Sequence, residues 1–108
     1  MTTSTRIESR DSFKETIQTE TPVAVEFSAG WCPDCRRLDM FMDDVLNHFD
    51  NLPLHKVDTE QLPDITSEQE VMGIPSILVF QNGEKIGHLH SADAKTPDQV
   101  SEFFSKYY

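Results

Sequence analysis

The sequence lacks the features of membrane-spanning and secreted proteins. No apolar run approaches the ~20 residues that a membrane helix requires. Residues 1–13 contain no basic stretch followed by an apolar block, which is the pattern of a secretory signal. Repeats, low-complexity tracts and linkers are also absent from the sequence. We therefore expect a cytosolic protein that does not associate with membranes.

Positive charge is scarce, because nine Lys and Arg residues face 19 Asp and Glu residues and give a formal net charge of −10. Such a balance opposes binding to nucleic acid and to anionic lipid. Glycine is scarce as well, and the four glycines do not form the glycine-rich fingerprint of a dinucleotide-binding loop. We therefore expect no nucleic-acid partner and no bound cofactor.

Cysteine occurs only twice, as Cys32 and Cys35. Two cysteines are too few for the disulfide framework of a small secreted domain, so their role is more chemical than structural. A chain of 108 residues corresponds to one domain that buries about two-thirds of its surface. We expect a single domain over residues 1–108.

Hydrophobic periodicity predicts alternating strands and helices. The expected strands are residues 5–7, 22–28, 52–58, 76–80 and 84–89. Two of the expected helices begin at Ser12 and Thr96, and the strongest helical pattern spans about residues 38–49. About residues 64–72 are expected to form a helix or an irregular segment. The order β-α-β-α-β-α-β-β-α predicts an α/β fold, in which a mixed sheet of four to five strands is covered by helices on both faces.

Two local signals fix details of this prediction. Ser12 with Glu15 has the spacing of a capping box, which places the first helix start at Ser12. Asn82-Gly83 is the preferred dipeptide of a two-residue hairpin, so the last two strands should pair antiparallel. Met40, Met42 and Met72 are interpreted as packing residues.

The cysteine pair precedes the strongest helix pattern. Cys32 should therefore lie at the helix N-terminus with Pro33 in the first turn, where free amides and the helix dipole favour a thiolate. Arg36 and Arg37 add positive charge within one turn. Cys35 follows three residues later, within range to close a disulfide by exchange. Asp34 opposes this trend, because its carboxylate is a like charge beside the thiolate.

Two alternatives to a redox pair remain open from these residues. C-x2-C is also half of many zinc sites, and the remaining ligands would have to come from His88, His90, His48 or His55. These histidines lack the usual H-x3–5-H spacing, and a long helix follows the pair instead of a tight knuckle turn. The other alternative is an inert pair of buried thiols, which the flanking Trp31 and arginines disfavour.

A wider set of motifs resembles the thioredoxin family. Trp31-Cys32-Pro33-Asp34-Cys35 follows a Val-Ala-Val-Glu-Phe strand, and Gly73-Ile74-Pro75-Ser76 precedes the strand that leads to Asn82-Gly83-Glu84. The resemblance covers about residues 11–104, with the elements in the family's order. It implies the thioredoxin fold and thiol-disulfide exchange.

The resemblance also implies the chemical roles. Cys32 matches the exposed nucleophile that attacks a substrate disulfide, and Cys35 matches the buried thiol that resolves the mixed disulfide. Glu26 matches the buried acid that accepts the Cys35 proton through water. From the sequence alone, a strand carboxylate such as Glu26 is more often a solvated one.

The remaining site residues are implied as substrate contacts. Pro75 matches the family's cis-proline, and the Ile74 backbone would pair with an extended substrate segment. Trp31 would belong to the docking surface, although a lone Trp could equally be core. Pro33 and Asp34 would complete that surface.

The chain departs from the family pattern at several positions. Pro33-Asp34 replaces the usual Gly-Pro, as in a branch of related proteins that share WCPDC. Glu26 replaces an Asp, Met40 lies where many members have a mid-helix proline, and Leu54 stands where some members have a lysine beside the buried acid. These departures bear on the substrate range.

Together these patterns predict a cytosolic thiol-disulfide oxidoreductase that acts mainly as a reductase. An NADPH-dependent thioredoxin reductase would recycle the oxidised form, since this chain has no dinucleotide fingerprint. One alternative is a reductase specialised for mixed disulfides of small thiols. The other is a non-catalytic binding module that uses the groove around Trp31 and Pro75.

Overall fold

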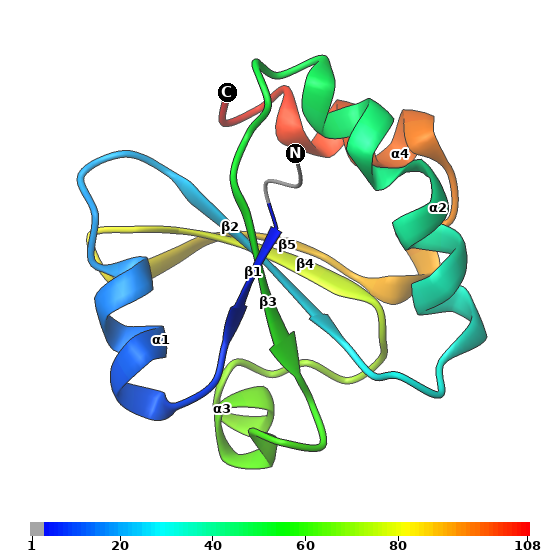
Figure 1. Cartoon of the computed structure of the whole chain (residues 1–108). Helices are drawn as coiled ribbons and strands as arrows, with labels where there is room; N and C mark the ends of the chain where they lie inside the picture. The colour runs from blue at the N-terminus through cyan, green and yellow to red at the C-terminus, as the bar shows by residue number, and fades with distance from the viewer. Residues whose placement is uncertain (1–3) are drawn as a thin grey trace.

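The computed structural model describes residues 4–108 as one five-stranded sheet with helices on both faces (Figure 1). The strands are β1 (Ser4–Ile7), β2 (Val23–Ser28), β3 (Leu54–Asp58), β4 (Ser76–Gln81) and β5 (Glu84–Leu89). The helices are α1 (Arg10–Ile17), α2 (Pro33–Asn47), α3 (Pro63–Glu68) and α4 (Pro97–Phe104), with a short 3-10 turn at Ser91–Asp93. The predicted α/β class, element order and mixed sheet are confirmed.

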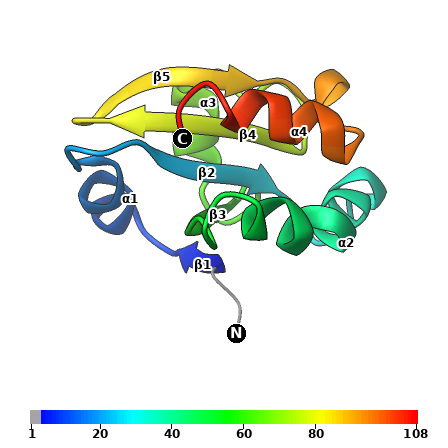
Figure 2. The same ribbon diagram turned by 90° about the horizontal axis from the view of Figure 1, so that it is seen from above.

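The sheet has the strand order β1-β3-β2-β4-β5, which is visible strand by strand in Figure 2. β3 lies parallel to both β1 and β2, because a helix returns the chain between these strands. β4 runs antiparallel to β2 and to β5. The helices α2 and α4 cover one face of the sheet, while α1 and α3 cover the other (Figure 1).

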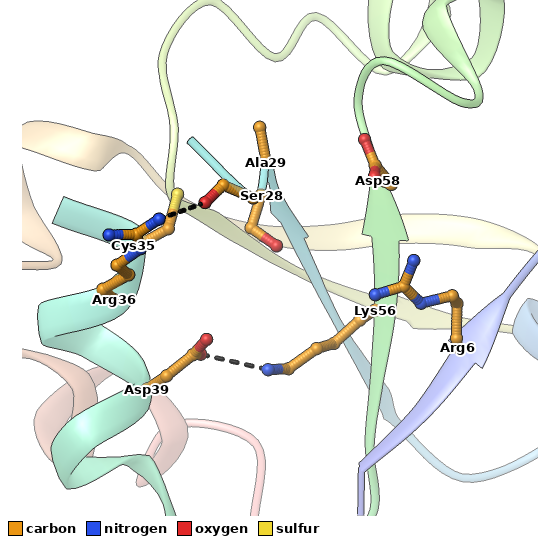
Figure 3. A pocket seen from close by; sticks show the side chains of 9 residues that line it. Arg6, Ser28, Ala29, Cys35, Arg36, Asp39, Lys56 and Asp58 are labelled. Carbon is orange, nitrogen blue, oxygen red and sulfur yellow. Dashed lines mark hydrogen bonds and ion pairs between the residues drawn. The ribbon is translucent and has the colours of Figure 1, made fainter. Parts of the chain in front are cut away.

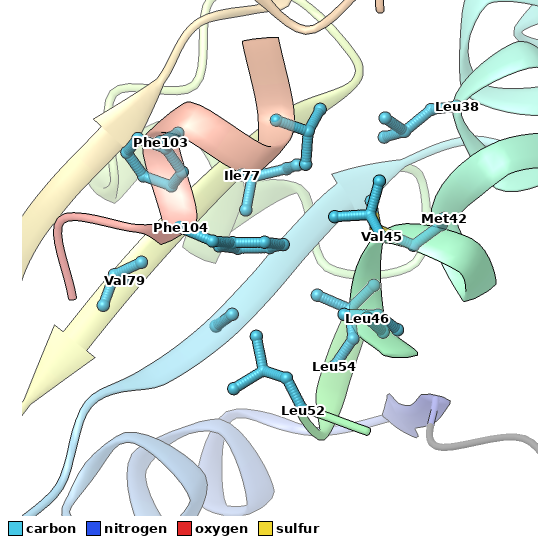
Figure 4. Packing of buried hydrophobic residues seen from close by; sticks show 12 residues of the cluster. Leu38, Met42, Val45, Leu46, Leu52, Leu54, Ile77, Val79, Phe103 and Phe104 are labelled. Atoms are coloured by element: carbon cyan, nitrogen blue, oxygen red, sulfur yellow. The ribbon is translucent and has the colours of Figure 1, made fainter. Parts of the chain in front are cut away.

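Each face of the sheet has its own hydrophobic core. The larger core lies beneath α2 and α4 (Figure 4) and contains, among others, Leu38, Met42, Leu46, Leu54, Ile77, Val79, Phe103 and Phe104. The core beneath α1 and α3 contains Ile7, Phe13, Ile17, Val25, Phe27, Val57, Ile65, Leu78 and Phe80. Alternation along β2 sends Ala24 to the first core and Val25 to the second, so Glu26 points toward α2.

The helix starts follow side-chain capping, with one correction. Ser9, not Ser12, caps α1, because the Ser9 hydroxyl accepts the Ser12 backbone N–H at 3.1 Å. Thr96 caps α4 in a full capping box, in which the side chain of Gln99 also accepts the Thr96 backbone N–H. No helix of the described residues is both long and apolar enough to cross a membrane.

The predicted hairpin between β4 and β5 is confirmed. Asn82 and Gly83 have φ values of 53° and 81°, the left-handed pair that a type I′ turn requires. Two other boundaries differ from the prediction. β3 begins at Leu54 instead of residue 52, since Pro53 has no N–H for the ladder and Asp50 and Asn51 form a turn with positive φ. α3 ends at Glu68.

The methionines divide between core and surface. Met42 is buried in the core beneath α2, as predicted. Met40 and Met72 are 86% and 92% exposed, so their interpretation as packing residues is wrong. Met40 lies on the solvent side of α2, and Met72 lies in the loop before β4. Periodicity alone does not reveal which helical face is left uncovered.

Candidate active site

The cysteine pair lies where β2 leads into α2. Cys32 is the N-cap residue of α2, and its extended backbone ends the loop that follows β2. The Cys32 sulfur accepts the Cys35 backbone N–H at 3.2 Å, and Pro33 occupies the first turn, where its missing N–H costs nothing. The sulfur therefore lies at the start of the helix and accepts one of its free amides, as the spacing predicts.

The loop before β4 forms the second wall of the site. The Ile74–Pro75 peptide bond is cis, as the resemblance implies. The Cys32 thiol points to the Ile74 carbonyl oxygen at 3.8 Å, across 42 residues of sequence. The structure thus places Ile74 and Pro75 beside Cys32.

Both thiols are shielded from solvent. Cys32 is 4% exposed and Cys35 is 2% exposed, and Ala29 and Ile74 pack against them. Cys32 is therefore less exposed than the resemblance implies, because Ile74 covers the sulfur. Trp31 is 62% exposed and contributes an open apolar surface beside the pair. The interpretation of Trp31 as a core residue is excluded.

Cys35 holds its proton more tightly than an ordinary cysteine thiol does. Burial raises the pKa of Cys35 well above its ordinary value, and the neighbouring Cys32 sulfur raises it further. The Glu26 carboxylate adds a smaller effect in the same direction. Cys35 therefore needs a proton acceptor before it can act as a nucleophile.

Glu26 is the buried acid of this site. Its side chain is fully buried, and neither carboxyl oxygen has a hydrogen-bond partner among the described residues. Burial raises the pKa of Glu26 to about 8; Lys56 opposes this rise and Asp39 adds to it. Glu26 can therefore exchange a proton near neutral pH, and its interpretation as a solvated carboxylate is excluded.

A lysine does accompany Glu26, although not at the position expected from the resemblance. Lys56 lies directly beside Glu26 in the register of β2 and β3, whereas Leu54 is a buried core residue. The Lys56 ammonium donates a hydrogen bond to Asp39 of α2 at 3.0 Å. Burial alone would lower the pKa of Lys56, but the Glu26 and Asp39 carboxylates raise it above its ordinary value.

A cavity of about 190 Å³ opens beside this cluster (Figure 3). Cys35 and Asp39 reach it from α2, and Lys56 reaches it from β3. The other lining residues are Arg6, Ser28, Ala29, Gly30, Arg36 and Asp58. The cavity is large enough for water molecules, and Cys35 is the member of the cysteine pair that lines it.

The histidines named for a zinc site are arranged differently. His88 and His90 stack on one another on and just beyond β5, with ring centroids 3.9 Å apart. Within residues 4–108, no group of three or more His, Cys, Asp or Glu side chains is placed to hold a metal ion.

Comparisons with known proteins agree with this geometry. The family model described as Thioredoxin matches residues 4–106. The chain belongs to the thioredoxin family. Thioredoxin from Callithrix jacchus is 31% identical over 101 residues, which is 91% of this chain and 96% of the relative. Thioredoxin from Oryctolagus cuniculus is 32% identical over 90 residues, or 82% of this chain and 86% of the relative.

Solved structures show the same fold. A thioredoxin structure from Malassezia sympodialis aligns with a TM-score of 0.84 at 24% identity and covers 96% of this chain and 92% of its own. A thioredoxin structure from Trypanosoma brucei brucei also aligns with a TM-score of 0.84, at 20% identity, covering 95% and 88%. This thioredoxin-family chain is a thiol-disulfide oxidoreductase with a C-x2-C pair at the start of α2.

Asp34 distinguishes this thioredoxin motif from the usual one, and the structure neutralises its charge. The Lys95 ammonium lies 2.7 Å from one Asp34 oxygen, and an Arg37 nitrogen lies 2.5 Å from the other. The hydrogen bond from Lys95 is the main cause that lowers the pKa of Asp34. Arg36 instead donates to the Gly30 carbonyl oxygen. The repulsion expected between Asp34 and the Cys32 thiolate is therefore largely offset.

This pairing gives the first prediction. Asp34→Asn should change the alkylation rate of Cys32 at neutral pH by less than about threefold, because exposed paired charges contribute little. The rate is measured with iodoacetamide in a Cys35→Ser background. Lys95→Gln, the matched control, leaves Asp34 with one partner and should slow alkylation. An acceleration of about tenfold or more in Asp34→Asn would show that Asp34 acts as an uncompensated charge.

Three polar residues of this thioredoxin site are not identifiable as such from the sequence. Lys56 and Asp39 meet only through the register of β2 with β3 and the placement of α2 above them. Lys95 reaches Asp34 across 61 residues. The sequence does contain one signal for Asp39: it follows Cys35 by four residues, which places the two side chains on the same face of a helix.

Proposed function

We propose that this protein is a cytosolic disulfide reductase. The Cys32 thiolate attacks one sulfur of a substrate disulfide, forms a mixed disulfide and releases the first substrate thiolate. Glu26, in its ionised form, then accepts the Cys35 proton through water, and the Cys35 thiolate attacks the Cys32 sulfur. The Cys32–Cys35 disulfide forms and the second substrate thiolate leaves; each substrate sulfur has gained one of the two electrons that the dithiol has lost, and both substrate thiolates take up protons from solvent.

One observation carries the assignment of roles. The Cys32 sulfur lies at the helix start and accepts the Cys35 N–H, whereas Cys35 lies three residues further along the chain and lines the cavity together with Lys56 and Asp39. Only Cys32 is adjacent to the open surface of Trp31 and the Ile74 loop. Cys32 is therefore the attacking thiol, and Cys35 is the resolving one.

The surroundings of the dithiol support the proposed direction of the reaction. Burial and the neighbouring Glu26 carboxylate both oppose a negative charge on Cys35. A dithiol whose thiolates gain little stabilisation loses its electrons more readily, so the couple is reducing. A reducing couple suits the cytosol, where an NADPH-dependent thioredoxin reductase would regenerate the dithiol.

The docking surface suits an extended segment of a protein substrate. Trp31 supplies an exposed aromatic face, and Pro33 adds an exposed ring at the start of α2. The Ile74 backbone, next to Pro75, would pair with the substrate in β-strand fashion. Asp34, paired with Lys95 and Arg37, borders this surface.

Substrate choice tests the proposal. Reduction of insulin and of cystine is followed as NADPH consumption in the presence of an NADPH-dependent thioredoxin reductase. Insulin should be reduced faster at equal disulfide concentration, because only a polypeptide fills the Trp31 and Ile74 surface. A clear preference for cystine would favour a reductase of small-thiol mixed disulfides. Partner binding that survives replacement of both cysteines, without turnover of either substrate, would favour a binding module.

A further inference from the structure

Four polar side chains on facing elements form one cluster. Glu26 and Lys56 are lateral neighbours on β2 and β3, and both point toward α2. Cys35 and Asp39, four residues apart on α2, share the helix face that lies above them. Figure 3 shows Asp39 and Lys56 reaching toward each other from these two layers. The cluster therefore holds two carboxylates and one ammonium beside the resolving thiol.

The Lys56 ammonium lies between two carboxylates, those of Glu26 and Asp39, and in the structure it pairs with Asp39. The Lys56 ammonium bonds to Asp39 at 3.0 Å, while both oxygens of Glu26 are left without a partner among the described residues. A fully buried carboxylate without a hydrogen bond is costly to ionise. Glu26 would ionise at lower pH if Lys56 turned toward it.

We propose that Asp39 is a positioning residue that holds the Lys56 ammonium away from Glu26 and thereby sets the pH at which Glu26 takes up and releases a proton. The inference deepens the proposed role of Glu26 as the acceptor of the Cys35 proton. Asp39 itself is half-exposed at the cavity. Its own carboxylate also raises the pKa of Glu26 directly, and the effect through Lys56 adds to this direct one. The high pKa of Glu26 agrees with this arrangement.

Other charges around the cluster modulate this effect without replacing it. The charged and titratable groups that face the cavity are Arg6 from β1, Cys35, Arg36 and Asp39 from α2, and Lys56 and Asp58 from β3. Arg36 is engaged with the Gly30 carbonyl oxygen, and Asp58 accepts the Glu60 backbone N–H. Arg6 opposes protonation of Lys56. The Asp39 carboxylate is the group that bonds to the Lys56 ammonium.

Asp39→Asn tests the inference directly. The variant frees Lys56 to pair with Glu26, so the midpoint of the Glu26 titration should fall by about 0.5 pH units or more. The titration is followed by the carbon-13 NMR signal of the Glu26 carboxyl group in the reduced protein. Asp43→Asn, which removes an exposed carboxylate one turn further along α2, is the matched control and should leave the midpoint unchanged. An unchanged or higher midpoint in Asp39→Asn overturns the inference.

A double-mutant comparison tests whether Asp39 acts through Lys56. In a Lys56→Met background, Asp39→Asn should shift the Glu26 midpoint by less than half as much as it does beside Lys56. An equal shift in both backgrounds would mean direct repulsion between the carboxylates and would overturn the positioning role.

The pH dependence of the resolving step separates this inference from the proposed function. It is measured as release of a peptide held on Cys32 as a mixed disulfide, and its midpoint should fall together with the NMR midpoint in Asp39→Asn. A shifted NMR midpoint with an unshifted release profile would support the positioning role of Asp39. The same result would contradict the proposed role of Glu26 as proton acceptor.

Discussion

Cys32→Ser is expected to abolish disulfide exchange, whereas Cys35→Ser should still form a mixed disulfide that does not resolve. The serine hydroxyl cannot form the sulfur–sulfur bond that the first step requires. In Cys35→Ser the Cys32 sulfur remains at the start of α2, bonded to the backbone N–H of residue 35, so its nucleophilic position is unchanged. Each variant should lower multiple-turnover reduction by at least about a thousandfold.

Intact-mass spectrometry after mixing with a disulfide-bonded peptide distinguishes the two variants. Cys35→Ser should gain the mass of one peptide chain in nearly stoichiometric yield, and a thiol reductant should remove it. The double variant Cys32→Ser with Cys35→Ser is the control for non-covalent binding. An equal yield of adduct from Cys32→Ser would reverse the roles of the two cysteines. The Cys35→Ser form also captures physiological substrates from cell extract.

Much of the fold could be predicted because its signals are local. The hairpin follows from the conformations that Asn82 and Gly83 adopt, and α4 follows from a capping box at Thr96 and an apolar stripe. Boundaries were less certain where two local signals compete. Ser9 and Ser12 are both cap residues by type, and only the completed turn shows that Ser9 provides the cap.

In the active site, too, the features that depend on local sequence could be predicted and those that depend on tertiary structure could not. The positions of Cys32 and Pro33 at the helix start can be predicted from the sequence, because their motif lies between a strand pattern and a helix pattern. The burial of Glu26 depends on α2 covering its side of the sheet, and its neighbour Lys56 depends on strand register. Register and helix placement are tertiary properties, which is why Leu54 was assigned the place that Lys56 occupies.

Glu26→Gln is expected to make the protein more stable at alkaline pH. The folded-state pKa of Glu26, about 8, lies above its ordinary value of 4.5, so the folded protein binds more protons than the unfolded chain between these pH values. The free energy of unfolding therefore falls as pH rises through this window. The shift of 8 − 4.5 = 3.5 corresponds to at most about 5 kcal/mol above pH 8, and to nothing below pH 4.5.

Urea unfolding of the wild type and Glu26→Gln across the pH range from 4 to 9 measures this effect. The difference between the two proteins should grow by several kcal/mol toward pH 9, whereas the buried amide's own cost, about 1 to 3 kcal/mol, is the same at every pH. Glu15→Gln, an exposed change on α1, should reproduce the pH dependence of the wild type. Glu26→Gln should also slow release of a mixed disulfide by about tenfold or more, since Cys35 loses its proton acceptor. A stability difference that does not vary with pH would show that burial does not raise the pKa of Glu26 in the folded protein, whereas an unslowed release would show that Glu26 is not the acceptor of the Cys35 proton.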